Sequence, residues 1–163
     1  MMRFNEYLTE GAKVDNIEKS PIESHKLSGV VLIYNNKILL VRPKKFKRKM
    51  RKWSIPKGHI ERKMSKMQTA LKELQEESRV KLKKRHLKQS EKFTLNYIKA
   101  GANKDLTCYV VNISKEEMNV RLFNDMILGN FLKGETVEAG FFSKEDAMTI
   151  IEKHQLELLK FLE

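Results

Sequence analysis

Three glutamates share one side of a predicted helix of about four turns that follows a Pro-Lys-Gly turn. At about 100° per residue, Glu73, Glu76 and Glu77 fall within one narrow arc. Leu71 and Leu74 point the opposite way, so the helix has a packing face and an acidic face. Carboxylates at this spacing offer hard oxygen ligands to one point above the helix, which suits Mg²⁺ or Mn²⁺. A solvated face is the other interpretation, because like-charged neighbours cost only about 0.2–0.5 kcal/mol per pair.

A glycine precedes these glutamates at a fixed interval. Together with its turn, the stretch resembles the Nudix hydrolase box, which runs Gly, five residues, Glu, seven residues, Arg-Glu, an apolar residue, any residue, Glu-Glu, any residue, Gly and an apolar residue. Gly58 opens the box here, the three glutamates take their places, and Val80 closes it. The resemblance implies the α/β Nudix fold, a mixed β-sheet sandwiched between helices. It would place a Nudix hydrolase domain at 26–163, after an N-terminal arm or short helix at 1–25.

Three positions depart from the box. Met64 stands where the first glutamate belongs, outside the carboxylate cluster, so we expect a disturbed loop anchor more than weaker metal binding. Lys72 replaces the arginine and lacks its planar fork, so we expect weaker orientation of Glu73. Arg79 replaces the second glycine, the usual left-handed helix cap, so we expect a helix that ends differently.

The resemblance implies hydrolysis of a pyrophosphate linkage with a divalent metal ion. Glu76 and Glu77 are the chief predicted ligands of Mg²⁺ (or Mn²⁺), with the Gly58 backbone carbonyl as a further ligand. Glu73 is either another ligand or the base that activates water. A divalent ion would turn the repulsion between the carboxylates into attraction, bridge phosphate oxygens and lower the pKa of a bound water.

Two later glutamates are additional candidates for the base, because some Nudix enzymes recruit it from a later loop. They are Glu135 and Glu138, just before Phe141. A structural ion pair is the alternative role for each, since buried carboxylates are normally paired.

Basic residues flank the box on both sides. The chain has 33 lysines and arginines against 21 acidic residues, a net charge of +12, and a pI near 9.7. Much of the excess lies in Arg42–Lys52 and Lys81–His86. Such an excess raises encounter rates with polyanions and is typical of RNA or DNA contact, although a solubility device is the alternative. We predict substrate phosphate contacts at Lys44, Arg51 and Lys57.

The substrate class stays open between hypotheses. Pro-Lys-Gly-His after a tryptophan resembles the diadenosine tetraphosphate hydrolases, which implies a dinucleoside polyphosphate. The basic surface favours instead the 5′ end of an RNA, with decapping or pyrophosphate removal as the reaction. Lys72 and Arg79 motivate a third hypothesis, an inactive Nudix-like protein that binds nucleic acid or travels in a virion. Aromatic side chains available to stack on a base are Phe46, Trp53, Tyr97 and Phe131.

Outside the box, the sequence pattern predicts strands and a terminal helix. The apolar runs 28–34 and 37–43, joined by Asn35-Asn36, predict a hairpin. Residues 92–100 and 105–113 predict a second strand pair around a Gly-Ala-Asn-Lys loop. Residues 120–134 fit a short helix or a loop beside the site. Ser143 starts the final helix, whose single stripe holds Ala147, Ile150, Ile151, His154 and Leu158. We interpret His154 as a packed or rim residue.

Composition sets the outer bounds. A chain of 163 residues with 40% apolar residues suits one globular core. No run approaches the roughly 20 apolar residues of a membrane span, and no secretory signal is evident, so we expect a cytoplasmic protein. Cys108 is the single cysteine. It lies in an apolar strand pattern, so we expect a small buried residue and no disulfide framework.

The first residues, MMRFNEYLTEGAK, resemble the capsid-targeting propeptides of internal proteins in tailed phages of the T-even group. That resemblance implies a processing site at Glu10 and a location in the host cytoplasm or the virion. An ordinary N-terminal helix is the alternative.

Overall fold

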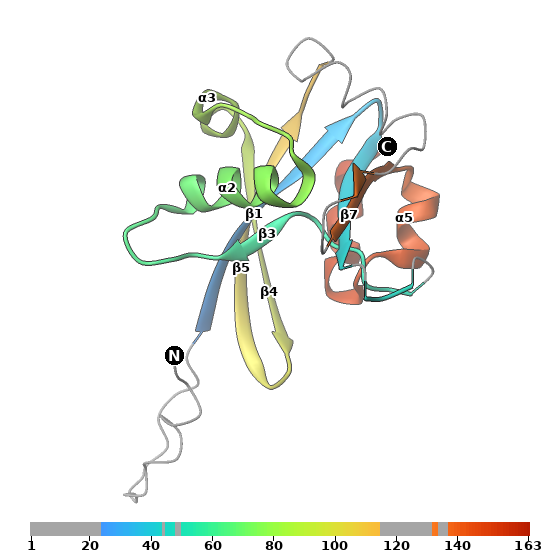
Figure 1. Cartoon of the computed structure of the whole chain (residues 1–163), viewed down its shortest axis with the longest axis horizontal. Helices are drawn as coiled ribbons and strands as arrows, with labels where there is room; N and C mark the ends of the chain where they lie inside the picture. The colour runs from blue at the N-terminus through green and yellow to red at the C-terminus, as the bar shows by residue number, and fades with distance from the viewer. Residues whose placement is uncertain (1–23, 44, 48–49, 115–131, 134–136) are drawn as a thin grey trace, which may run out of the picture.

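The structure is a computed structural model that describes residues 24–43, 45–47, 50–114, 132–133 and 137–163 (Figure 1). Its elements are β1 (Ser24–Tyr34), β2 (Lys37–Pro43), β3 (Lys57–His59), α2 (Lys66–Ser78), α3 (Lys84–Lys88), β4 (Glu91–Lys99), β5 (Ala102–Asn112), β6 (Leu132–Lys133), β7 (Val137–Phe142), α5 (Lys144–Ile150) and the 3-10 helix η2 (Lys153–Phe161). The strands form one sheet in the order β4-β5-β1-β2-β7-β6, and β3 pairs with β1. β1 is parallel to β5 and antiparallel to β2 and β3, so the sheet is mixed, as predicted.

The central strand β1 is buried on both faces and separates two cores. Val31 and Ile33 belong to a cluster with residues of α5 and η2. Val30 and Leu32 belong to a second cluster with residues of α2 and α3. Because successive side chains of a strand point to opposite faces, α2 and α3 cover one face of the sheet, and α5 and η2 cover the other (Figure 1). The predicted α/β/α arrangement is confirmed.

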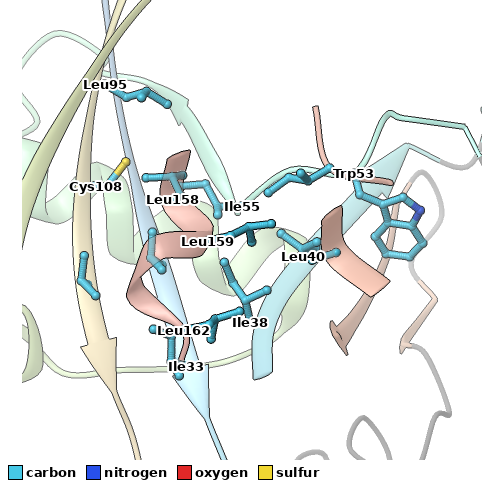
Figure 2. Packing of buried hydrophobic residues seen from close by; sticks show 14 of the residues in the cluster. Ile33, Ile38, Leu40, Trp53, Ile55, Leu95, Cys108, Leu158, Leu159 and Leu162 are labelled. Atoms are coloured by element: carbon cyan, nitrogen blue, oxygen red, sulfur yellow. The ribbon is translucent and has the colours of Figure 1, made fainter. Parts of the chain in front are cut away.

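The core on the η2 face is filled mainly by aliphatic side chains. Figure 2 shows Leu158, Leu159 and Leu162 of the C-terminal segment packed toward Ile38 of β2. Burying each such side chain contributes about 1.5–3 kcal/mol. Cys108 lies in the same cluster, and burial raises the pKa of its thiol to about 12. The prediction of a small buried cysteine is therefore confirmed.

The first predicted hairpin forms as expected. β1 and β2 are joined by Asn35 and Asn36, which have φ values of 50° and 59°. Two successive left-handed residues make the type of turn whose twist matches a β-hairpin, and asparagine tolerates that conformation. Tyr34 pairs with Lys37 directly beside the turn. Pro43 ends β2, as predicted.

The second predicted hairpin has a shorter loop than expected. Lys99 pairs with Ala102, so the turn consists of Ala100 and Gly101, with φ values of 53° and 77°. The prediction that the whole Gly-Ala-Asn-Lys segment is a loop is wrong. A two-residue turn of this type lets the ladder continue to its end, and Lys104 therefore becomes a strand residue.

The C-terminal helical segment is broken, whereas the sequence predicts one helix. Ser143 caps α5 as predicted, since its side chain accepts a hydrogen bond from the Asp146 N–H at 3.2 Å. At Ile151 the backbone is extended, with φ −71° and ψ 147°, and the residue forms a β-bridge with Trp53. The Glu152 N–H then donates to the Trp53 carbonyl at 2.8 Å. The bridge explains the break, because extended pairing at 151 is incompatible with helical dihedrals.

Several predicted segments lie largely or wholly outside the described residues. They are the N-terminal arm with Glu10, and the segment 120–134 apart from β6. Among the helices that the structure describes, none is long and apolar enough to cross a membrane.

Candidate active site

The acidic helix is held in one orientation by its cap and by its apolar face. The Ser65 hydroxyl accepts a hydrogen bond from the Gln68 N–H at 3.0 Å, and Gln68 Oε1 accepts one from the Ser65 N–H at 2.9 Å. Ala70 and Leu74 are fully buried against the sheet, and Leu71 packs beside them. The predicted packing face is confirmed. A capping box of this kind stabilises the start of a helix by about 1 kcal/mol.

Gly58 allows the closest approach between α2 and the strand β3. A Cβ atom at this position would lie 2.3 Å from Glu73 Cδ and 2.4 Å from Glu73 Oε2. Every other residue type would therefore displace the Glu73 carboxylate. The glycine of the box is required here because a carboxylate packs directly against its backbone.

The register of β3 decides which backbone carbonyl faces the acidic helix. Positions 56 and 60 are hydrogen-bonded to β1 at 3.2 and 3.1 Å, and Gly58 pairs with Ser28 between them. Hydrogen-bonded pairs recur at every second residue of an antiparallel ladder, so the Gly58 carbonyl points toward β1. The polar backbone groups of Lys57 point to the outer edge, where its N–H donates to Glu77 Oε1 at 3.1 Å.

Glu77 is a largely buried carboxyl group. Burial, followed by the charge of Glu73, raises the pKa of Glu77 to about 7. The hydrogen bond from the Lys57 N–H opposes this rise only in part. Near neutral pH the group therefore exchanges a proton readily, and a nearby cation would favour its charged form.

The other two glutamates share a lysine. Lys72 Nζ lies 3.6 Å from Glu73 Oε2 and 3.7 Å from Glu76 Oε2. The same ammonium lies 3.4 Å from Glu61 Oε2. The side chain of Glu73 is 15% exposed and that of Glu76 is 57% exposed. Burial raises the pKa of Glu73, and the charge of Lys72 opposes that rise.

These residues match the chemistry of a Mg²⁺ or Mn²⁺ site in their donor atoms. Three carboxylates and an outward carbonyl are hard oxygen ligands, and Gly58 leaves space for one carboxylate against the backbone. Among the described residues, however, no group of three or more potential ligands already surrounds a common metal position. The Glu73 and Glu76 carboxylates instead contact Lys72, so the carboxylates must rearrange to bind an ion.

A group of lysines, which we call the lysine cluster, lies on the η2 face of the sheet. It consists of Lys57, Lys99 and Lys104. Burial lowers the pKa of Lys57, the charges of Lys99 and Lys104 lower it further, and Glu152 and Glu77 oppose the shift. Side chains alternate along β3, so the Lys57 side chain points away from α2 while its backbone contacts Glu77. The lysine cluster and the acidic helix therefore meet at this one residue.

Polar and aromatic side chains surround the lysine cluster. Lys99 Nζ lies 2.9 Å from Glu152 Oε1, and Lys104 Nζ lies 3.1 Å from His25 Nδ1. The rings of Tyr97 and His154 are stacked, with centroids 3.9 Å apart. The interpretation of His154 as a packed residue agrees with this contact.

An open pocket of about 450 Å³ lies on the β4–β5 hairpin, and only Tyr97 and Lys104 of its lining residues share the face of the lysine cluster. It is lined by Asn96, Tyr97, Ile98, Asn103, Lys104 and Asp105. Its volume lies within the usual range of small-molecule sites.

A family model of the NUDIX domain matches residues 24–162. The chain belongs to this family. Nudix enzymes are hydrolases that act on phosphoanhydride bonds, and the predicted enzyme class is confirmed at this level. Among curated proteins, no match was found.

Solved structures show the same Nudix fold at low sequence identity. A MutT NUDIX hydrolase from Burkholderia pseudomallei has a TM-score of 0.61 and 16% identity, over 85% of this chain and 97% of that one. An Ap4A hydrolase from C. elegans, in a binary complex, has a TM-score of 0.57 and 20% identity, over 83% and 93%. A bifunctional NMN adenylyltransferase/ADP ribose pyrophosphatase from Francisella tularensis, complexed with AMP and a Mn ion, has a TM-score of 0.58 and 17% identity, over 96% and 46%.

Two departures from the Nudix box have structural explanations. The expectation that Arg79 ends the helix differently is wrong: Arg79 itself adopts the left-handed conformation, with φ 66° and ψ 8°, and its N–H donates to the Gln75 carbonyl at 2.8 Å. Met64 stands at the position of the first glutamate of the box, and a different loop carboxylate, that of Glu61, contacts Lys72. Glu61 was not predicted as a site residue because its contact with Lys72 depends on the path of the loop, in which Lys63 adopts the left-handed conformation with φ 68°.

The remaining predicted site residues have different locations. Arg51 Nη1 donates to the Ile151 carbonyl at 3.0 Å, so it joins the segment before Trp53 to the C-terminal segment. Glu138 is buried and paired with Arg42, which agrees with its structural alternative. Lys44 and Glu135 lie outside the described residues.

The aromatic residues proposed to stack on a base also lie in different environments. Trp53 is 1% exposed and packs edge-on against Phe142, so no base can stack on it. Phe46 lies beneath the ammonium of Lys52, 4.9 Å from ring centroid to Nζ. Phe131 lies outside the described residues. Tyr97 is left as the described candidate next to the lysine cluster.

Lys99, Lys104 and Glu152 were not predicted as site residues. Their only signal in the sequence is the alternation of β4, which points Tyr97 and Lys99 to one face. Lys104 was not recognised because the sequence placed it in a loop, whereas it lies in β5. Glu152 was not recognised because the sequence predicted one unbroken helix across it.

Proposed function

We propose that this Nudix protein hydrolyses a phosphoanhydride bond of a dinucleoside polyphosphate, with Mg²⁺ or Mn²⁺ as its cofactor. The observation that carries the proposal is the junction at Lys57. Its backbone contacts the acidic helix through Glu77, and its side chain belongs to the lysine cluster. A polyphosphate chain that crosses β3 at this point would have one phosphoanhydride next to the carboxylates and its other phosphates next to the lysines.

The metal ligands in this proposal are Glu73, Glu76, Glu77 and one backbone carbonyl. The register favours the Lys57 carbonyl over that of Gly58, because it faces the outer edge beside Glu77. When bound, the ion would offset charge on the phosphates and lower the pKa of a water molecule. The near-neutral pKa of Glu77 and the raised pKa of Glu73 make either carboxylate able to accept the proton of that water.

The lysine cluster supports a long anionic substrate. Lys99 already pairs with Glu152, whereas the ammonium of Lys104 contacts the ring of His25, so a second phosphate would add a negative charge next to Lys104. Tyr97, whose ring stacks on His154, offers an aromatic side chain to a nucleoside on the same face as the lysine cluster. The fold similarity to an Ap4A hydrolase agrees with this choice.

A second candidate substrate is the 5′ end of an RNA. The observation that favours it is the charge of the segment around α3, where exposed basic side chains follow the acidic helix. They are Lys81, Lys83, Lys84, Arg85 and Lys88. A strand of RNA leaving the site would meet this segment, and its binding would weaken steeply with added salt.

The proposed function is tested with diadenosine tetraphosphate and Mg²⁺. Wild-type protein should release nucleotide products, and Glu77→Gln should lower kcat by about 100-fold or more, because it removes a ligand and a proton acceptor. Glu157→Gln, an exposed residue of η2 paired with Lys160, is the matched control. Absence of hydrolysis with diadenosine tetraphosphate would contradict the proposed substrate class, and absence of hydrolysis with ADP-ribose as well would contradict the proposed activity.

A competition experiment separates the two substrate classes. Triphosphate-ended RNA and diadenosine tetraphosphate are assayed at low and moderate salt. A preference for RNA that disappears with salt would favour the second candidate, whereas a preference for the dinucleotide at both salt concentrations would support the first.

A further inference from the structure

Lys72 occupies the position of a cation within the acidic site. Its ammonium lies 3.6 Å from Glu73 Oε2, 3.7 Å from Glu76 Oε2 and 3.4 Å from Glu61 Oε2. Two of these three carboxylates are proposed metal ligands, and the third belongs to the loop before α2. A divalent ion and the Lys72 ammonium would therefore compete for the carboxylate oxygens of Glu73 and Glu76.

The lysine side chain can leave these carboxylates and return to them. An ammonium is a compact point charge on a flexible four-carbon stem, so it can change partner without moving the backbone. Glu61 is 61% exposed at its side chain, and its contact with the ammonium is the shortest of the three. It is therefore a partner that the ammonium can keep when the other two contacts are lost.

We infer that Lys72 is a tethered counter-ion of the site: it neutralises Glu73 and Glu76 while no divalent ion is bound, and it gives up these two contacts and keeps only Glu61 when one binds. The inference rests on the proposed metal-dependent function. Lys72 is a positioning residue in this account, because it touches neither the substrate nor the metal.

Two consequences follow from the same contacts. Metal binding must displace the ammonium from two carboxylates, so the site binds a divalent ion more weakly than its glutamates alone would. Glu61 makes the displacement easier, because the released charge keeps a partner. Removing Lys72 should therefore strengthen metal binding, and removing Glu61 should weaken it as long as Lys72 is present.

The inference is tested by the binding of Mn²⁺ alone, measured by calorimetry and by the electron paramagnetic resonance signal of the free ion. Lys72→Gln should lower the Kd by about three- to tenfold, the factor expected for two partly exposed ion pairs. Glu61→Gln should raise the Kd about threefold, for the loss of one such pair. In the Lys72→Gln background, Glu61→Gln should change the Kd by less than about twofold.

Lys66→Gln is the matched control, since it removes the same charge from an exposed position on the first turn of α2. Its effect on Mn²⁺ binding should be less than about twofold at 0.15 M salt. A Kd that rises or stays unchanged in Lys72→Gln would overturn the inference and leave Lys72 as an ordinary support for Glu73. If wild type and Lys72→Gln both fail to bind Mn²⁺, the proposed metal-dependent function fails as well, so the two failures are distinguishable.

Discussion

The acidic helix and the lysine cluster lie on opposite faces of the sheet and are built in different ways. All three glutamates come from one helix, within five consecutive positions. The lysines come from β3, β4 and β5, and their counter-charge Glu152 comes from the C-terminal segment. Among the described elements, only β3 contributes to both regions, through the backbone and the side chain of Lys57.

This difference determines how each region responds to change. The acidic side depends on a close contact between α2 and Gly58, and on the position of one lysine. The lysine cluster depends on strand register and on the break at Ile151, which are properties of the whole fold. Substitutions on the acidic side should therefore alter chemistry, whereas those that alter the sheet should alter stability.

Two glycines of neighbouring strands provide the sharpest test of that distinction. Gly58→Ala should lower kcat by about 100-fold or more with little loss of stability, because its Cβ meets the end of the Glu73 side chain, which can rotate away. Gly29→Ala should destabilise the fold by about 1–3 kcal/mol, because its Cβ would lie 2.4 Å from the Pro56 carbonyl oxygen. Thermal unfolding and hydrolysis rates measure the two effects. Equal losses of stability in both variants would contradict the distinction.

The pH dependence of stability tests the burial of Glu77. Its pKa of about 7 in the folded protein exceeds the ordinary value of 4.5, so the folded state binds the proton more tightly. The resulting stability is complete below pH 4.5 and is lost as the pH rises through 7. In metal-free buffer, Glu77→Gln should be more stable than wild type by about 3 kcal/mol at pH 8 and nearly equal to it at pH 4.5. A constant difference across this range, measured by denaturant unfolding, would show that Glu77 is not the titrating group.

Neighbouring lysines of the sheet test the lysine cluster itself. Lys104→Gln should lower kcat/KM for diadenosine tetraphosphate by about tenfold, through loss of a phosphate contact. Lys26→Gln is its matched control, because Lys26 pairs with Asp105 on the α2 face of the sheet. We expect its kcat/KM to change by less than about twofold. Equal effects of the two substitutions would indicate general electrostatic attraction in place of a defined contact.

The smallest expected effect concerns the end of the acidic helix. Arg79 adopts a left-handed conformation that costs a non-glycine residue about 1 kcal/mol. Arg79→Gly should therefore raise the free energy of unfolding by about 0.5–1 kcal/mol and leave hydrolysis nearly unchanged. Loss of stability would show that the arginine side chain contributes more than the backbone strain costs.

Much of the acidic side was predictable because its pattern is local. The spacing of Gly58 and the glutamates, the packing face of α2 and the Asn-Asn hairpin all depend on residues close together in the chain. The predicted carbonyl ligand shows the limit of such arguments. Gly58 is the residue that the box marks, yet the ladder turns its carbonyl toward β1 and leaves the Lys57 carbonyl facing outward.

The amino-acid sequence by itself determined the family, the acidic helix and the glycine that brings a carboxylate to the backbone. The helix and its acidic face follow from periodicity, and the family follows from the resemblance of one short segment to a known box. Only the tertiary structure decided that Lys72 contacts two of the glutamates, that Glu61 shares that lysine, and that Lys57, Lys99 and Lys104 gather on the other face. Their proximity depends on strand pairing and chain breaks between distant segments, and no local pattern encodes such distances.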